Sequence, residues 1–207
     1  AVLDTTPAEM RGAVLRWVTE MARGMQIYSH RSPDRDGVVA PWTSDDLQRY
    51  CYFVAGTVGH MLTELFAAEL KLEPDSVAAR RMSELAEPFG AGLQLVNILK
   101  DITDDLHRGW SFVPRSLCRA NGVSNRDLSN PEYRTEAHRA VVPLFDLARR
   151  NLDRALDYAL SIPPEHGEVR LFCLLPLWLA VRTIGRAYGN DAMFTVEAEV
   201  KVSRLEV

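Results

Sequence analysis

The chain has 207 residues, 47% of them apolar, so it can bury one sizeable core and most simply forms a single domain. Its formal net charge is −4, with 24 Lys and Arg residues scattered among 28 Asp and Glu residues. This pattern offers no basic stripe that could follow a phosphate backbone, so nucleic acid is excluded as a predicted partner. Cys51, Cys118 and Cys173 are too widely spaced to suggest zinc or a disulfide framework, which indicates reduced thiols.

Helical periodicity dominates the chain, and no stretch alternates apolar and polar residues long enough to predict a sheet. The expected fold is therefore an all-α bundle. A first helix is expected from Pro7 to about Tyr28, followed by an exposed loop. A second is expected over residues 44–70, capped by Thr43 or Ser44. Because it carries no charge between residues 50 and 59, this helix is predicted to be central and buried.

The third helix is expected from about Pro74 to Asp105, with a kink or a division at Pro88 and Gly90. After a loop, two further helices are expected over about residues 131–161 and 165–188. The last of these contains the longest apolar run, residues 171–181, which is about half of the roughly twenty residues that span a bilayer. The run is therefore not expected to cross a membrane.

A polar face of the third helix carries the most informative residues. At about 100° per residue, one arc of a continuous helix collects Gln94, Asn97, Asp101 and Asp105, with Asp104 at its edge. Carboxylates this close repel one another unless cations neutralise them. Such oxygen ligands suit Mg²⁺, which bridges a few carboxylates to substrate phosphates. The alternative is a solvated acidic face, although a polar stripe in an otherwise apolar helix calls for buried partners.

The buried second helix is unusually poor in side-chain bulk at Ala55, Gly56 and Gly59. Glycine inside a helix costs about 1 kcal/mol relative to alanine, so the space must serve a purpose. Either a neighbouring helix packs closely there, or a long apolar substrate lies against it. Tyr50, Val54 and Val58 recur at one-turn spacing, which places a phenol at the head of an apolar wall. That phenol either anchors a core hydrogen bond or exchanges a proton near a cation.

Three segments, in this order, resemble motifs of the squalene/phytoene synthase family. The stretch YCYFVAGTVG, residues 50–59, is similar to the tyrosine-bearing helix of that family. The stretch GLQLVNILKDITDD, residues 92–105, resembles its second aspartate-rich motif, with Lys100 where an arginine is usual. The stretch RGWSFVP, residues 108–114, resembles its loop ending in proline, with Trp110 where a smaller or basic residue often sits. The implied fold is an isoprenoid synthase-type helical bundle around a central cavity.

This resemblance implies roles for particular side chains. Asp101 and Asp105, with Asp104, would hold Mg²⁺ against a substrate diphosphate, and Tyr50 would assist proton transfer. The implied substrate-lining residues on the two motif helices are Gln94, Asn97, Val54, Ala55 and Val58. Arg108 would either pair with the carboxylates or contact phosphate. Lys201 and Arg204 would face NADPH in a squalene-forming enzyme, the alternative being a solvated tail.

The implied reaction is the head-to-head condensation of two farnesyl diphosphates to presqualene diphosphate and squalene. The close alternative is phytoene formation from geranylgeranyl diphosphate. A further alternative is a non-catalytic helical relative that binds a partner, which would be expected to have lost the acidic residues. A terpene cyclase would not be expected to carry the tyrosine motif. The predicted location is the cytoplasm, with peripheral contact to a membrane through which an apolar product leaves.

One departure concerns the first aspartate-rich motif of the family, which has no counterpart before Tyr50. The chain also opens with Ala1 rather than methionine. We therefore expect residues 1–207 to form a single partial domain that lacks about the amino-terminal third of a longer enzyme. Because one metal-binding wall would hold diphosphate poorly, the activity is assigned to that longer protein.

Overall fold

The computed structural model describes residues 7–195 and residue 200, and every regular element in that part is a helix. This confirms the predicted all-α fold. The α-helices are α1 (Ala8–Ser29), α2 (Ser44–Cys51), α3 (Thr57–Glu69), α4 (Val77–Lys100), α5 (Ile102–His107), α6 (Arg115–Ala120), α7 (Arg134–Ser161) and α8 (Gly167–Ala187). A π turn, η2 (Tyr52–Gly56), and three 3-10 turns, η3 (Arg126–Ser129), η4 (Pro131–Tyr133) and η5 (Asp191–Phe194), complete the set.

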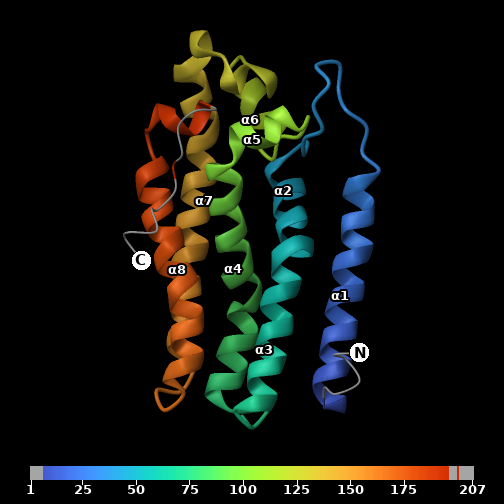
Figure 1. Cartoon of the computed structure of the whole chain (residues 1–207), viewed down its shortest axis with the longest axis vertical. Helices are drawn as coiled ribbons and strands as arrows, with labels where there is room; N and C mark the ends of the chain where they lie inside the picture. Colours follow the sequence, from blue (N-terminus) through green and yellow to red (C-terminus); the bar gives the residue numbers. More distant parts are fainter. Residues whose placement is uncertain (1–6, 196–199, 201–207) are drawn as a thin grey trace.

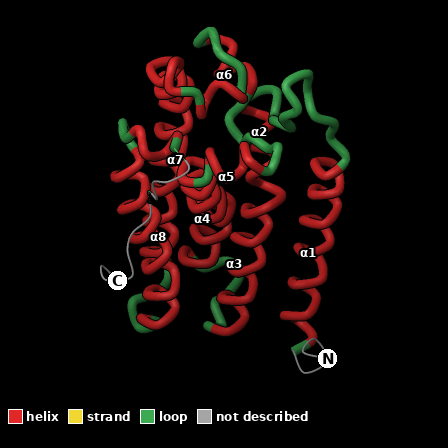
Figure 2. The backbone as a smooth tube through the Cα atoms, turned by 45° about the horizontal axis from the view of Figure 1, so that its top comes forward, coloured by secondary structure: helices red, strands yellow, loops and turns green. Residues whose placement is uncertain are grey.

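The long helices run side by side along the long axis of the molecule, with α4 between α3 and α7 (Figure 1). The loop of residues 30–43, between α1 and α2, lies at the same end as α5 and α6, which we call the upper end (Figure 2). Within the described ranges, none of the helices is both long and apolar enough to cross a bilayer.

The second predicted helix is a continuous rod made of α2, η2 and α3, and not one regular α-helix. It begins as expected, because the Thr43 side chain accepts a hydrogen bond from the Asp46 backbone N–H at 3.2 Å. The π turn at Tyr52–Gly56 was not predicted. Such turns are frequent at functional sites, and this one begins two residues after Tyr50.

Of the two alternatives predicted at Pro88 and Gly90, the division of the helix is wrong and the kink stays a prediction. The helix continues through both residues and ends at Lys100, where Asp101 adopts φ −108° and ψ 17° before α5 begins. Gly90 serves close packing: a Cβ there would lie 2.0 Å from the Ala55 carbonyl oxygen. The same holds on α3, where a Cβ at Gly59 would lie 1.9 Å from the Ala86 carbonyl oxygen. The small residues therefore let two backbones approach, which was one of the two predicted uses.

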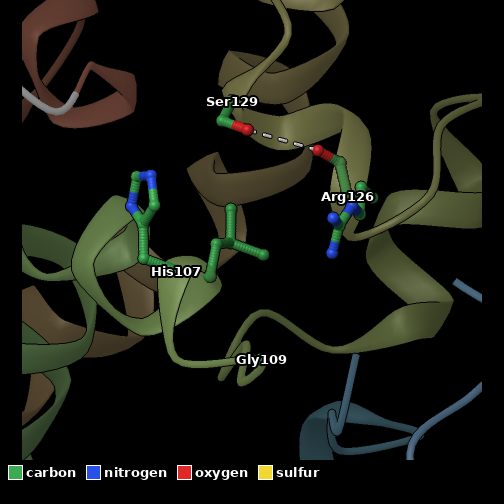
Figure 3. A pocket seen from close by; sticks show the side chains of 5 residues that line it. His107, Gly109, Arg126 and Ser129 are labelled. Carbon is green, nitrogen blue, oxygen red and sulfur yellow. Dashed lines mark hydrogen bonds between the residues drawn. The ribbon is translucent and has the colours of Figure 1, made fainter. Parts of the chain in front are cut away.

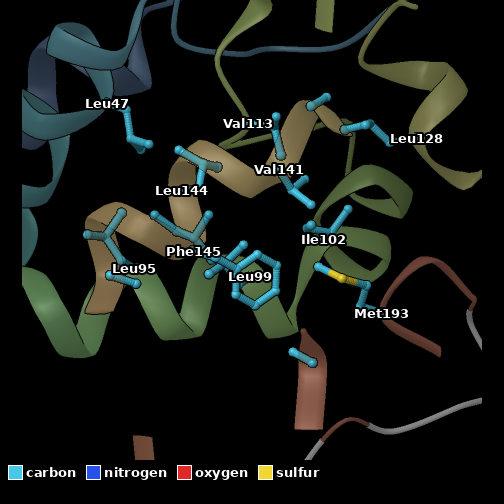
Figure 4. Close-up of a cluster of buried hydrophobic side chains, with 14 of the residues drawn as sticks. Leu47, Leu95, Leu99, Ile102, Val113, Leu128, Val141, Leu144, Phe145 and Met193 are labelled. Atoms are coloured by element: carbon cyan, nitrogen blue, oxygen red, sulfur yellow. The ribbon is translucent and has the colours of Figure 1, made fainter. Parts of the chain in front are cut away.

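The buried side chains form two clusters along this bundle. The upper core packs α2, α4 and α7 around Leu47, Leu95, Leu99 and Leu144 (Figure 4). The lower core joins α4, α7 and α8; its fully buried members include Met82, Leu85, Tyr158, Ile162 and Cys173. In agreement with the sequence, the three cysteines are free and buried. Both cores are apolar. The half-buried Asp105 and the aromatic rings near it lie where the upper core meets the loops.

Candidate active site

A cavity of about 300 Å³ opens at the upper end of the bundle, and it brings together two residues that the sequence singled out, Tyr50 and Asp105. The other lining residues come from the end of α1 and from the segment after α5: Met25, Tyr28, Ser29, Trp110 and Phe112. We call this space the Tyr50–Asp105 cavity. Three segments that are far apart in the sequence thus supply one site.

Aromatic rings form one wall of this cavity. Tyr50 stacks on Phe112 with ring centroids 4.6 Å apart, and Trp110 stacks on the same ring at 6.2 Å. Tyr28 meets Tyr50 edge-on at 5.1 Å. Ring faces carry negative charge density, so such a wall is suited to a cationic group. Sequence reasoning missed Tyr28 and Phe112, although the motif RGWSFVP contained a signal for the latter.

The Asp105 carboxyl group is held in an environment that disfavours its charge. Its pKa is raised to about 6, mainly by burial and also by the charges of Asp101 and Asp104, against the opposing charges of Arg108 and Lys100. Arg108 Nη1 lies 3.6 Å from Asp105 Oδ1, as one of the two predictions for this arginine expected. Its side chain is 72% exposed, however, so this ion pair is weak. An added cation would therefore stabilise the ionised form.

The predicted metal ligands do not lie on one continuous helix, because the chain turns at Asp101. Asp101 forms an ion pair with Lys100, and Asp104 is exposed. Over residues 7–195 and at residue 200, no three His, Cys, Asp or Glu side chains are grouped so that they could hold a metal ion. A Mg²⁺ ion here would have to take most of its shell from phosphates and waters, with fewer than three of these carboxylates as ligands. They do not form an all-protein cage.

Tyr50 is buried, with 7% of its surface exposed, where the cavity meets the upper core. Burial is the main cause that raises its pKa to about 12, and the charges of Cys51 and Asp105 add to the effect. The phenol therefore keeps its proton at neutral pH. It can donate a hydrogen bond or a proton to an anionic group that enters the cavity.

The remaining predicted residues lie away from the cavity lining. Val54, Ala55 and Val58 are half-buried on η2 and α3, and on α4 Gln94 is half-buried while Asn97 is exposed. Lys201 and Arg204 lie outside the described residues. The structure thus brings Tyr50 and Asp105 into one cavity, whereas the five residues predicted to line the substrate are not among the residues that line this cavity.

A second cavity, of about 250 Å³, lies between the end of α5 and η3 (Figure 3). It is lined by Leu106, His107, Gly109, Arg126 and Ser129. The Ser129 hydroxyl donates to the Arg126 carbonyl oxygen at 3.4 Å, and His107 Nδ1 is bonded to the Thr103 carbonyl oxygen at 2.8 Å. Because His107 and Arg126 lie on opposite sides of this space in Figure 3, their basic groups do not converge.

The longest apolar run of the sequence, residues 171–181, exposes large apolar side chains on helix α8. They recur mostly every three residues and are Phe172, Leu175, Trp178 and Val181, with Leu171 beside them. At one end, the Phe172 ring meets the Phe66 ring of α3 edge-on at 5.9 Å. At about 100° per residue, positions 172 and 181 lie on opposite sides of the helix, so these side chains spread around the outer half of α8 and do not form one stripe.

Comparison with known proteins places these features in context. The family described as Squalene/phytoene synthase matches residues 1–206. The squalene synthase of Schizosaccharomyces pombe is 28% identical over 192 residues, which cover 92% of this chain and 40% of that protein. The phytoene synthase of Thermus thermophilus is 37% identical over 118 residues, covering 57% of this chain and 37% of that protein. The chain thus spans about two fifths of the length of these curated relatives.

Solved structures share the fold at lower sequence identity. The ligand complex of TcSQS has a TM-score of 0.83 at 22% identity, over 98% of this chain and 55% of that one. The squalene synthase HpnC from Alicyclobacillus acidocaldarius has a TM-score of 0.62 at 19% identity, over 90% of this chain and 73% of that one. The helical arrangement described above is therefore that of known proteins.

Proposed function

The chain belongs to the squalene/phytoene synthase family, and on this premise we propose that it forms part of a prenyltransferase acting on isoprenyl diphosphates. The observation that carries the proposal is the Tyr50–Asp105 cavity, which combines a carboxylate in need of a cation with a protonated phenol and an aromatic wall. Because the chain spans about two fifths of its curated relatives, the activity is assigned to a longer protein that contains it.

Asp105 and Asp101, assisted by Asp104, would hold Mg²⁺ together with the diphosphate. When bound, Mg²⁺ would neutralise charge on the leaving diphosphate. Tyr50, which keeps its proton at neutral pH, would donate to an oxygen of that leaving group. The faces of Phe112 and Trp110 would stabilise the allylic carbocation left behind and keep water from it.

The apolar parts of the substrates need surfaces of matching length. We assign Val54, Ala55 and Val58 on η2 and α3 to one wall, together with Gln94 and Asn97 on α4. The exposed apolar side chains of α8, which reach α3 at Phe172 and Phe66, support a second wall for a prenyl chain. Arg108, mostly exposed beside Asp105, is free enough to turn from its weak ion pair to a phosphate.

For the product, we propose head-to-head condensation of two farnesyl diphosphates to presqualene diphosphate and squalene. The second step would use NADPH, with Lys201 and Arg204 as proposed contacts. Phytoene formation from geranylgeranyl diphosphate is the alternative, favoured by the higher identity to a phytoene synthase over a shorter stretch. Peripheral contact with a membrane stays a prediction that follows from the apolar product.

Product analysis of the full-length protein tests this proposal. The protein would be incubated with Mg²⁺ and either farnesyl or geranylgeranyl diphosphate, with and without NADPH. We expect squalene from the first substrate only when NADPH is present. Asp101→Ala should abolish it, and Tyr50→Phe should lower the rate at least about tenfold. Asp153→Ala, an exposed aspartate on α7, is the matched control. No condensation product from either substrate would overturn the proposal and favour a non-catalytic relative.

A further inference from the structure

Asp46, in the first turn of α2, binds the end of α1 tightly. Both of its carboxylate oxygens accept hydrogen bonds from the Arg31 guanidinium, each at 2.6 Å. The same carboxylate accepts the Trp42 backbone N–H at 3.0 Å and the Tyr28 hydroxyl at 3.2 Å. Its side chain is only 17% exposed, so these bonds are shielded from water. The sequence motifs gave this aspartate no role.

Tyr28 connects this ion pair to the cavity. Its hydroxyl also lies 3.0 Å from the Asp46 backbone carbonyl oxygen, and the Arg31 guanidinium lies over its ring at 4.2 Å. The ring is 5% exposed and meets Tyr50 edge-on at 5.1 Å. Tyr28 is thus held at its hydroxyl and on one face, while its ring packs against the tyrosine to which we assign proton transfer.

The rest of loop 30–43 is fixed by a separate set of contacts. Val39 pairs with the segment after α5, through Val39 N–H to the Gly109 carbonyl oxygen and Ser111 N–H to the Val39 carbonyl oxygen, each at 2.9 Å. Arg115 Nη2 donates to the Val38 carbonyl oxygen at 2.9 Å and lies 3.4 Å from Asp34 Oδ2. Asp34 therefore anchors the same loop but forms no hydrogen bond with Tyr28. A variant of Asp34 thus controls for a general effect of the loop on Tyr50.

We propose that Asp46 is a positioning residue for Tyr50 and that it acts through Tyr28. The proposal rests on the catalytic role proposed for Tyr50. Without the Asp46 carboxylate, Arg31 loses both of its hydrogen bonds to Asp46 and the Tyr28 hydroxyl keeps only the Asp46 backbone carbonyl oxygen. The guanidinium that covers the Tyr28 ring is then no longer fixed, so the ring that packs against Tyr50 is held less firmly. A proton donor must be held within about half an ångström of its productive place, so this loosening lowers the rate of the chemical step.

Kinetics of the full-length protein with farnesyl diphosphate and Mg²⁺ test this. Asp46→Asn keeps the size of the side chain and should lower kcat about tenfold, with KM changed less than about twofold. Tyr28→Phe, which keeps the ring and removes only the hydroxyl, should lower kcat by a smaller factor. Asp34→Asn should leave kcat within about twofold. Equal losses in Asp46→Asn and Asp34→Asn would overturn the proposal, because they would indicate a general effect on the loop.

A double-mutant cycle separates positioning from stability. On a Tyr50→Phe background the hydroxyl is already absent, so adding Asp46→Asn should change the remaining kcat less than about twofold. A further tenfold fall on that background would show that Asp46 acts independently of Tyr50 and would overturn the proposal. Tyr28→Phe on the same background gives the same comparison with a milder change.

A spectroscopic measurement keeps the proposal testable if the protein makes no product. In protein labelled with [ζ-¹³C]tyrosine, the Tyr50 signal is assigned by its loss in Tyr50→Phe. We expect it to shift or broaden in Asp46→Asn and Tyr28→Phe but not in Asp34→Asn. An unchanged Tyr50 signal in both of the first two variants overturns the proposal. Absence of product from a wild-type protein in which the signal does respond instead counts against the proposed function alone.

Discussion

The two ends of the bundle differ in what they bury: the lower end buries apolar side chains, and the upper end also buries charged groups beside a cavity. Toward the lower end, the α4 backbone touches that of α3 at Gly59 and that of η2 at Gly90, and apolar side chains fill the lower core. At the upper end, α2 and α5 carry half-buried aspartates beside a cavity lined with aromatic rings. Close apolar packing raises the free energy of unfolding, whereas a buried charge without a full set of partners lowers it.

This difference indicates that the lower end supplies stability through close packing of its helices. The upper end can therefore contain buried charged groups that lower the stability of the fold. Asp105 is such a group, with a pKa raised by burial. Asp46 shows the opposite treatment: its hydrogen bonds with Arg31 are the first cause that lowers its pKa. Loss of close packing at Gly59 should therefore destabilise the protein, whereas loss of the Asp105 charge should stabilise it.

The largest expected effect is at the lower end. Gly59→Val places a Cβ where the Ala86 carbonyl oxygen lies, so α3 and α4 must move apart. We expect the free energy of unfolding, measured by urea denaturation, to fall by about 3 kcal/mol. The control is Gly185→Ala on α8, where a Cβ meets nothing within 4 Å, and which should add about 0.5–1 kcal/mol. A well-tolerated Gly59→Val would remove the argument for close packing.

The next effect has the opposite sign and concerns Asp105. Its pKa is raised to about 6, above the value of about 4 for an unfolded aspartate. Between these values the folded state binds more protons, so the free energy of unfolding falls as pH rises from about 4 to about 6 and is level above. In metal-free buffer at pH 7, Asp105→Asn should therefore be more stable than wild type by roughly 1–2 kcal/mol, after allowance for solvent screening.

Added Mg²⁺ sharpens the same comparison without any assay of activity. An ion that binds only the folded protein raises its stability as concentration exceeds the dissociation constant. Mg²⁺ and inorganic diphosphate together should raise the thermal unfolding temperature of the wild-type full-length protein more than that of the Asp105→Asn variant. Equal stabilisation of both proteins would contradict a role for this carboxylate in metal binding.

A smaller effect is expected from one polar contact inside the lower core. The Thr63 hydroxyl donates to the Gly59 carbonyl oxygen at 2.8 Å, so the Tyr158 hydroxyl, 2.9 Å away, must be the donor to Thr63. Tyr158→Phe leaves no buried donor without a partner and should cost about 1 kcal/mol in urea denaturation. A loss above about 3 kcal/mol would indicate that this bond also fixes the α3–α4 contact.

The smallest effect is expected where exposed charges meet. Arg81 lies 3.3 Å from both Glu84 and Asp157, with 48% of its side chain exposed. Arg81→Ala should change the free energy of unfolding by less than about 0.5 kcal/mol, and less still in high salt. A larger change would mean that exposed ion pairs contribute to the stability of the fold beside the packing of the lower core.

Much of the fold was predictable because helix signals are local. Periodicity, the Thr43 cap and the flanking loops gave the main helices to within a few residues. The predicted division at Pro88 and Gly90 is wrong, since α4 continues through both residues while it packs against α3 and α7. The turn at Asp101 was not predicted, because the spacing of the polar residues from Gln94 to Asp105 fits one continuous helix.

The sequence by itself determined the all-α class, the identity of the two motifs, and the presence of Tyr50 and Asp105 in them. Only the tertiary structure decided that these two residues line one cavity, that Tyr28, Phe112 and Trp110 complete its wall, and that Asp46 holds Tyr28. The physical reason is range. Helix formation follows from neighbours three or four residues apart, whereas the cavity is lined by residues up to 87 positions apart, from Met25 to Phe112, which no local pattern records.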